Sequence, residues 1–87
     1  MNELRIQHVD FDADHLIVDF SDARRLEIPL RHFPRLQTAT DEQRKDWSLI
    51  GRGRGVHWEN LDEDLSVENL LTAYSRGKSS DYAATRA

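Results

Sequence analysis

The stretch that decides the fold is His57–Ser66, HWENLDEDLS, because it connects a short strand to the start of the last helix. Residues 56–58 combine a β-branched residue with two aromatic rings, which favours a strand. The acids at 62–64 predict a solvated turn that leads directly into a helix. Ser66 is a good N-cap for that helix, because its hydroxyl can accept a hydrogen bond from a free backbone N–H of the first turn.

Three further strands are predicted at the start of the chain. Leu16, Val18 and Phe20 alternate with polar residues, as in a strand with one buried face. A change of phase near His8–Val9 predicts a β-bulge in the strand before it. The predicted strands cover residues 4–11, 15–20 and 24–28, separated by Asp-containing turns. Such an antiparallel meander buries only one face, so later helices must cover it.

The middle of the chain predicts short elements. Pro29 and Pro34 confine residues 30–33 to about one helical turn. Thr40 and Gln43 have capping-box spacing, which predicts a short helix over 41–46. Residues 47–50 and 56–58 then read as a hairpin around the loop Gly51–Gly55, and Gly77 is the natural end of the last helix.

Eighty-seven residues predict one small domain. We expect an α+β fold over residues 1–77: a three-stranded antiparallel meander plus a short second hairpin, covered by two or three short helices. Residues 78–87 are small, polar and aperiodic, and predict a disordered C-terminal tail. A homodimer would add the buried area that so short a chain lacks.

The chain contains no cysteine, which excludes disulfides, thiolate zinc sites and cysteine nucleophiles. It also contains no long apolar run and no signal-peptide pattern, so we expect a cytoplasmic protein without membrane contact. Charge is segregated along the sequence. Residues 1–23 hold one basic and six acidic residues, residues 24–54 hold eight and four, and residues 55–87 hold three and six. This layout fits either two partner surfaces or internal charge pairing.

The acids Asp62, Glu63 and Asp64 are the first candidate site. They could contact a basic partner. Alternatively, their negative charges could simply stabilise the positive N-terminal end of the helix that follows. A divalent cation with Asn60 as a further ligand is a weaker alternative, because the EF-hand spacing is absent. His57 could act as a general base with Asp62 or Asp64, but no nucleophile has a recognisable context. We therefore predict no catalytic residue, no metal and no cofactor.

The basic middle of the chain is the second candidate site. Arg44, Lys45, Arg52 and Arg54 could contact the phosphates of a nucleic acid. The glycines at 51, 53 and 55 do not form a phosphate-binding loop, because no Gly-Lys-Ser/Thr opens a helix there. A hairpin loop explains these glycines better, and a contact with an anion or a nucleic-acid backbone is the alternative.

From Leu30 onward the chain resembles the bacterial family called domain of unknown function 2442. The matching residues are Leu30, Phe33-Pro34-Arg35-Leu36, Ala39-Thr40, Gln43-Arg44, Trp47, Leu49-Ile50-Gly51, Gly53, Gly55, His57-Trp58, Leu61-Asp62-Glu63-Asp64-Leu65-Ser66 and Leu70-Leu71. The first strands fit in pattern, so the resemblance covers residues 4–74. Glu59 departs from it, since that position usually holds proline.

The resemblance implies a small α+β fold without an established activity. Its members are commonly encoded beside a small predicted toxin, which implies the antitoxin half of a toxin–antitoxin pair, and some relatives carry an added helix-turn-helix domain. We expect a non-enzymatic, protein-binding module whose partner is a basic toxin. The alternative is a nucleic-acid-binding regulator of transcription or RNA that uses the basic middle.

Overall fold

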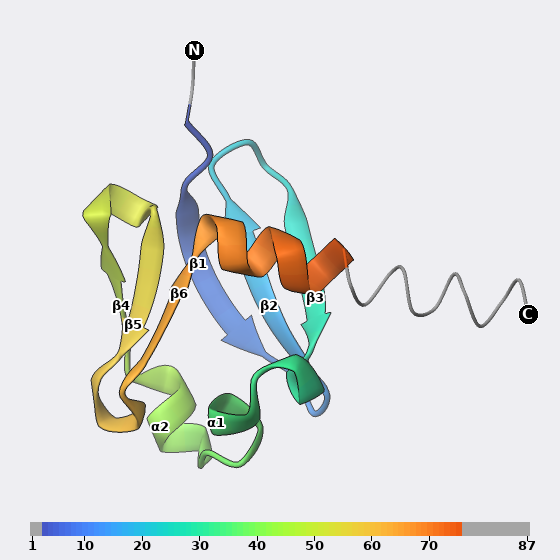
Figure 1. The fold of residues 1–87 in the computed structure, drawn as a ribbon, viewed down its shortest axis with the longest axis vertical. Coiled ribbons are helices and arrows are strands. Elements are labelled where there is room, and N and C mark those ends of the chain that lie inside the picture. The colour runs from blue at the N-terminus through green and yellow to red at the C-terminus, as the bar shows by residue number, and fades with distance from the viewer. Residues whose placement is uncertain (1–2, 76–87) are drawn as a thin grey trace, which may run out of the picture.

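The computed structural model describes residues 3–75, which form two three-stranded antiparallel sheets with the strands of each in sequence order (Figure 1). The first sheet contains β1 (Ile6–Phe11), β2 (His15–Phe20) and β3 (Arg25–Pro29). The second contains β4 (Trp47–Ile50), β5 (Gly55–Trp58) and β6 (Glu63–Ser66). Three short helices complete the described part, so the predicted α+β fold is confirmed.

The first sheet follows the alternation in its sequence. Leu16, Val18 and Phe20 are buried, whereas the residues between them are only partly buried. The predicted bulge in β1 is present between Ile6 and His8, slightly before its predicted position. The extra residue there shifts the pairing by one, and this keeps apolar side chains of β1 on the core face.

The segment between the sheets is helical in short pieces. They are the 3₁₀ turn η1 (Leu30–His32), α1 (Pro34–Gln37) and α2 (Asp41–Lys45). Pro34, which we expected to end a turn, instead occupies the first turn of α1, where its missing N–H costs nothing. The capping box before α2 is confirmed, since Thr40 accepts from the Gln43 N–H and the Gln43 side chain accepts from the Thr40 N–H.

The second sheet differs from the prediction at the acidic stretch. The hairpin of β4 and β5 is present, with η2 (Gly51–Gly53) at its tip, but β6 adds a third strand. Only η3 (Glu59–Leu61) and Asp62 form the turn, and Asp62 adopts the left-handed conformation at φ 50°. The prediction that all three acids lie in a turn was wrong. Pairing with β5 satisfies the backbone groups on one side of β6 and buries Leu65, while leaving the Asp64 side chain in solvent.

The last helix follows β6 directly and is described over residues 67–75. The predicted N-cap is confirmed, because Ser66 Oγ accepts from the Asn69 N–H and Asn69 Oδ1 accepts from the Ser66 N–H, each at 3.0 Å. The predicted helix end at Gly77, the domain limit there and the disordered tail of residues 78–87 lie outside the described residues.

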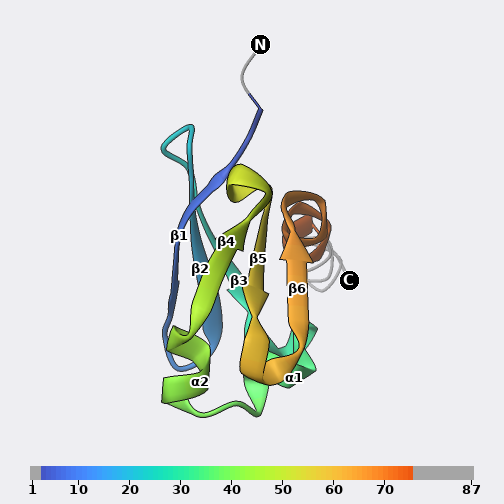
Figure 2. The same cartoon turned by 90° about the vertical axis from the view of Figure 1, so that its left-hand side faces the viewer.

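The molecule has two layers, which Figure 2 shows edge-on. The second sheet and the last helix lie on the same side of the first sheet and cover its inner face. Trp58 is the largest of the fully buried side chains, and Leu36, Leu70 and Val56 are also completely buried. The core therefore joins both sheets, α1 and the last helix into one unit.

Two apolar side chains of β4 are exposed. Leu49 is 39% and Ile50 is 44% accessible, and they are the exposed large hydrophobic residues of the described chain. The expected homodimer stays a prediction, for which this edge strand offers a contact. No helix within residues 3–75 is long and apolar enough to cross a membrane.

Candidate protein-binding surface

The turn between β5 and β6 is held by hydrogen bonds to α1, to α2 and to the residue that follows α2. Arg35 of α1 donates from its guanidinium to the Asp62 carbonyl at 2.6 Å. The Asn60 side-chain amide donates to Asp46 at 2.9 Å, just after α2. The Trp58 indole N–H donates to the Arg44 carbonyl, also at 2.9 Å. These contacts fix the acids at the start of β6 to a rigid support.

His57 and Asp64 form an ion pair across the second sheet. They lie opposite each other in β5 and β6, and His57 Nδ1 is hydrogen-bonded to Asp64 Oδ1. This hydrogen bond raises the pKa of His57, burial opposes the rise, and the negative charges of Asp64, Glu59 and Asp62 add to it. His57 therefore keeps its proton to a higher pH than a free imidazole does. The Asp64 side chain is 67% exposed, so the pair lies at an open surface and not in a closed site.

The raised pKa of His57 predicts a pH dependence of folding. Protonated His57 is favoured in the folded state, so its contribution to stability is complete at pH values below 6.5, the ordinary pKa of histidine. This contribution is lost as the pH rises through the higher pKa of His57 in the folded protein. Asp64→Asn should lower the His57 pKa in an NMR titration. It should also make the unfolding free energy depend less on pH between 6.5 and the folded-state pKa of His57. Glu59→Gln, which removes charge but no hydrogen bond, should lower the pKa less. An unchanged pKa in Asp64→Asn would contradict the pairing.

Five carboxylates lie along β6 and in the segments directly before and after it, and we call them the acidic surface. Four are exposed and Glu63 is half-buried. The members are Glu59, Asp62, Glu63, Asp64 and Glu68. Glu63, Asp64 and Glu68 line one hollow, and the charges of Asp64, Glu59 and Asp62 all act on His57. Sequence reasoning missed this grouping, and the alternation of Asp64 and Leu65 was the signal that could have indicated a strand.

The same region is part of a known family pattern. A family described as protein of unknown function (DUF2442) matches residues 6–75. The chain belongs to the DUF2442 family. It is also similar to the crystal structure of a protein of unknown function from Rhodospirillum rubrum, with 34% identity and a TM-score of 0.69, over 82% of this chain and 88% of that one. A search of curated proteins gave no match.

The four basic residues of the alternative site do not form one surface in this DUF2442 chain. Arg44 is 14% exposed in its side chain, because its guanidinium donates to the carbonyls of Leu36 and Gln37 at 2.9 Å each. Arg52 and Arg54 lie at the β4–β5 tip, whereas Lys45 ends α2 at the other end of that hairpin (Figure 1). Arg54 also pairs with Glu3 at 3.1 Å. Arg44 holds α2 to α1 and is not available for phosphates.

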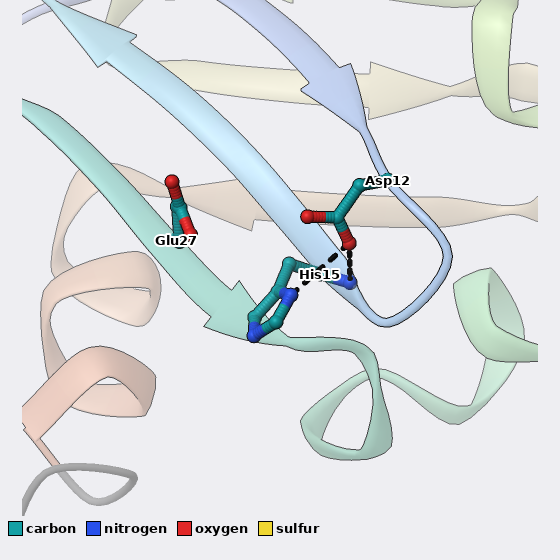
Figure 3. A group of neighbouring side chains, drawn as sticks. All are labelled: Asp12, His15 and Glu27. Atoms are coloured by element: carbon teal, nitrogen blue, oxygen red, sulfur yellow. Dashed lines mark hydrogen bonds and ion pairs between the residues drawn. The ribbon is translucent and has the colours of Figure 1, made fainter.

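A possible metal-ligand group lies elsewhere in this DUF2442 chain, at the β1–β2 turn (Figure 3). Ligand atoms of Asp12, His15 and Glu27 lie within 4.8 Å of one another. Asp12 Oδ1 accepts from the N–H groups of Asp14 and His15 and lies 3.0 Å from His15 Nδ1. These bonds lower the pKa of Asp12, the Asp14 N–H most strongly, and they form the turn. The hydrogen bonds account for the approach of Asp12 to His15, and we assign no metal to the group.

Proposed function

We propose that this DUF2442 domain is a non-enzymatic protein-binding module of the cytoplasm, which holds a basic partner in the manner of an antitoxin. The observation that carries the proposal is the acidic surface. Its five carboxylates stand on a strand, a turn and a helix. Arg35 donates to the backbone carbonyl of Asp62, and His57 pairs with the Asp64 carboxylate.

Electrostatic complementarity supports this choice of partner. Charges on exposed side chains contribute little to the stability of the domain itself, because water and salt screen them. The same charges attract and orient an approaching basic protein, and they raise its association rate. A toxin that acts on nucleic acid needs a basic surface to meet phosphates. An acidic surface of fixed shape could cover that surface and compete with the nucleic acid.

The surface also suits binding better than catalysis. The His57–Asp64 pair has groups that could serve in acid–base catalysis, but its Asp64 carboxylate is exposed to water. Catalysis by charge stabilisation depends on a site that excludes water. At an exposed position, the same pair instead fixes the Asp64 carboxylate in place for a partner's cation.

The proposal predicts that neutralising the acids weakens partner binding. The triple variant Asp62→Asn, Glu63→Gln, Asp64→Asn should weaken the complex with the protein encoded by the neighbouring gene at least tenfold at low salt. Asparagine keeps the left-handed backbone at position 62 accessible. The measurement is co-purification after co-expression, followed by titration calorimetry at two salt concentrations.

A matched control separates local from overall charge. Asp14→Asn, Glu27→Gln and Glu42→Gln change the net charge equally and are all exposed, but lie outside the acidic surface. They should leave the affinity within about twofold, which is a few tenths of a kcal/mol. Equal weakening by both triples, or no complex at low salt with the unaltered protein, would refute the proposed function.

A further inference from the structure

β6 is an edge strand with one unpaired side. The order of the second sheet is β4-β5-β6, and no other strand of the described chain pairs with β6. Edge strands present unpaired N–H and C=O groups, which another chain can meet by adding a strand of its own.

The hydrogen-bond pattern shows which residue of β6 presents these groups. Val67 N–H donates to the Arg54 carbonyl at 2.9 Å, so this pair is of the hydrogen-bonded type. In an antiparallel ladder, hydrogen-bonded and non-hydrogen-bonded pairs alternate. Counting from Arg54–Val67, the next hydrogen-bonded pair is therefore Val56 with Leu65. Asp64, opposite His57, is then of the other type, and its N–H and C=O point away from β5.

The Ser66 N–H supports this assignment independently. It donates to Asn69 Oδ1 at 3.0 Å, and therefore also points away from β5. This agrees with the alternation, because residues two apart in a strand direct their N–H groups to the same side. Because the helix cap occupies the Ser66 N–H, Asp64 is the place on this edge where an extended chain could form a pair of backbone hydrogen bonds.

A hollow of about 470 Å³ lies along this edge, between β6, the last helix and the segment after β3. Glu63, Asp64 and Leu65 all line it. Consecutive strand residues alternate between the two faces of a sheet, so three in a row can share a hollow when it runs along the strand edge. We call it the β6 hollow.

The walls of the β6 hollow indicate the chemistry of its occupant. Glu63, Asp64 and Glu68 bring three carboxylates to it. His32 is also in the wall, and its Nε2 atom is buried without a hydrogen-bond partner. A buried polar atom without a partner is uncommon in proteins and gains from an incoming polar group. The hollow is thus acidic and polar, and it lies beside free backbone groups.

We propose that an extended, basic segment of the protein partner binds in the β6 hollow as an added strand, with backbone hydrogen bonds to Asp64 and a lysine or arginine side chain among Glu63, Asp64 and Glu68. This inference rests on the proposed function, since it specifies how the acidic surface holds a basic protein. Backbone pairing supplies the register, and the carboxylates supply the preference for a cationic side chain.

The first test uses synthetic nine-residue peptides of alternating lysine and threonine. At low salt, the peptide should slow hydrogen exchange of the Asp64 amide at least tenfold and shift the NMR signals of Glu68 and Asn69. A copy N-methylated at alternate amides keeps its charge but loses one pairing edge, and should not protect Asp64. A glutamate–threonine peptide should not bind.

The second test separates the backbone of Asp64 from its side chain. Asp64→Ala removes the carboxylate and keeps the N–H, whereas Asp64→Pro also removes the N–H, at an edge position where proline is tolerated. Peptide affinity should fall severalfold in Asp64→Ala and at least tenfold further in Asp64→Pro. Circular dichroism verifies folding. If Asp64→Pro does not fold, the N-methylated peptide with the unaltered protein makes the same distinction.

Several outcomes would overturn the inference. Equal binding of the plain and N-methylated peptides, or equal affinities of the alanine and proline variants, would exclude strand addition. Protection of the Asp64 amide without peptide would assign the edge to the protein itself: to a second copy if protection rises with concentration, and to the same chain if it does not. If the neighbouring protein binds and the acidic triple variant weakens it, but Asp64→Pro matches Asp64→Ala, the proposed function stands and the strand addition fails.

Discussion

Replacing Trp58 with alanine should lower the free energy of unfolding by about 4 kcal/mol, close to the whole stability expected of so small a domain. Trp58 is 0% exposed and is the largest of the fully buried side chains. Its ring meets Phe11 edge-on, with the centroids 6.3 Å apart, and its N–H donates to the Arg44 carbonyl at 2.9 Å. The variant loses apolar contact with both layers and leaves a large cavity. Urea unfolding followed by circular dichroism measures the change.

Two further variants show what the Trp58 result means. Trp58→Phe keeps most of the apolar contact but leaves the Arg44 carbonyl without its donor, which should cost about 2 kcal/mol. Trp47→Ala is the matched control, because that ring is only half-buried at the edge strand and meets His8 at 5.5 Å. If Trp47→Ala destabilised the protein as much as Trp58→Ala, the core would not be centred on Trp58.

Gly53→Ala should lower the free energy of unfolding by about 3 kcal/mol, for two reasons. Gly53 has φ +88°, which an alanine rarely adopts, and an added Cβ would lie 2.8 Å from the Ile6 carbonyl oxygen. That oxygen belongs to the backbone of β1, so it can move only if the β4–β5 tip separates from the first sheet. Thermal unfolding of the purified variant measures the loss.

Gly51→Ala is the control that isolates the contact between the sheets. Gly51 has φ +57°, but an added Cβ there would meet the Arg54 side chain at an ordinary 3.7 Å. Its cost should be near 1 kcal/mol, the penalty of the left-handed backbone alone. If the two variants were equally destabilised, the close approach of Gly53 to Ile6 would contribute nothing to stability.

Much of the fold could be predicted from short-range patterns. The strand alternation around Leu16 and Val18, the capping box of Thr40 and Gln43, and the N-cap at Ser66 all depend on residues within a few positions of one another. The assignment of the acids at 62–64 to a turn was wrong for a related reason. Consecutive acids are expected in solvent, but an edge strand also leaves alternate side chains in solvent, and only its pairing distinguishes the two cases.

The candidate site depended on contacts between distant segments. His57 and Asp64 were each visible in the sequence, but their pairing follows from the register of β5 with β6. Arg44 was predicted at a nucleic-acid surface, although its guanidinium is occupied by carbonyls of the segment before α2. Charge alone could not reveal this, because a partner of Arg44 several residues away is brought near only by the turn between α1 and α2.

The sequence by itself determined the α+β class, the order of most elements, the helix caps and the presence of an acidic stretch, because neighbouring residues produce these through local hydrogen bonds and alternation. Only the tertiary structure decided that this stretch forms β6, that Asp64 pairs with His57 and presents its backbone at a free edge, and that Glu68 lines the same hollow as Asp64. These features arise when the second sheet and the last helix close over the first sheet, and burial of the shared core sets their positions.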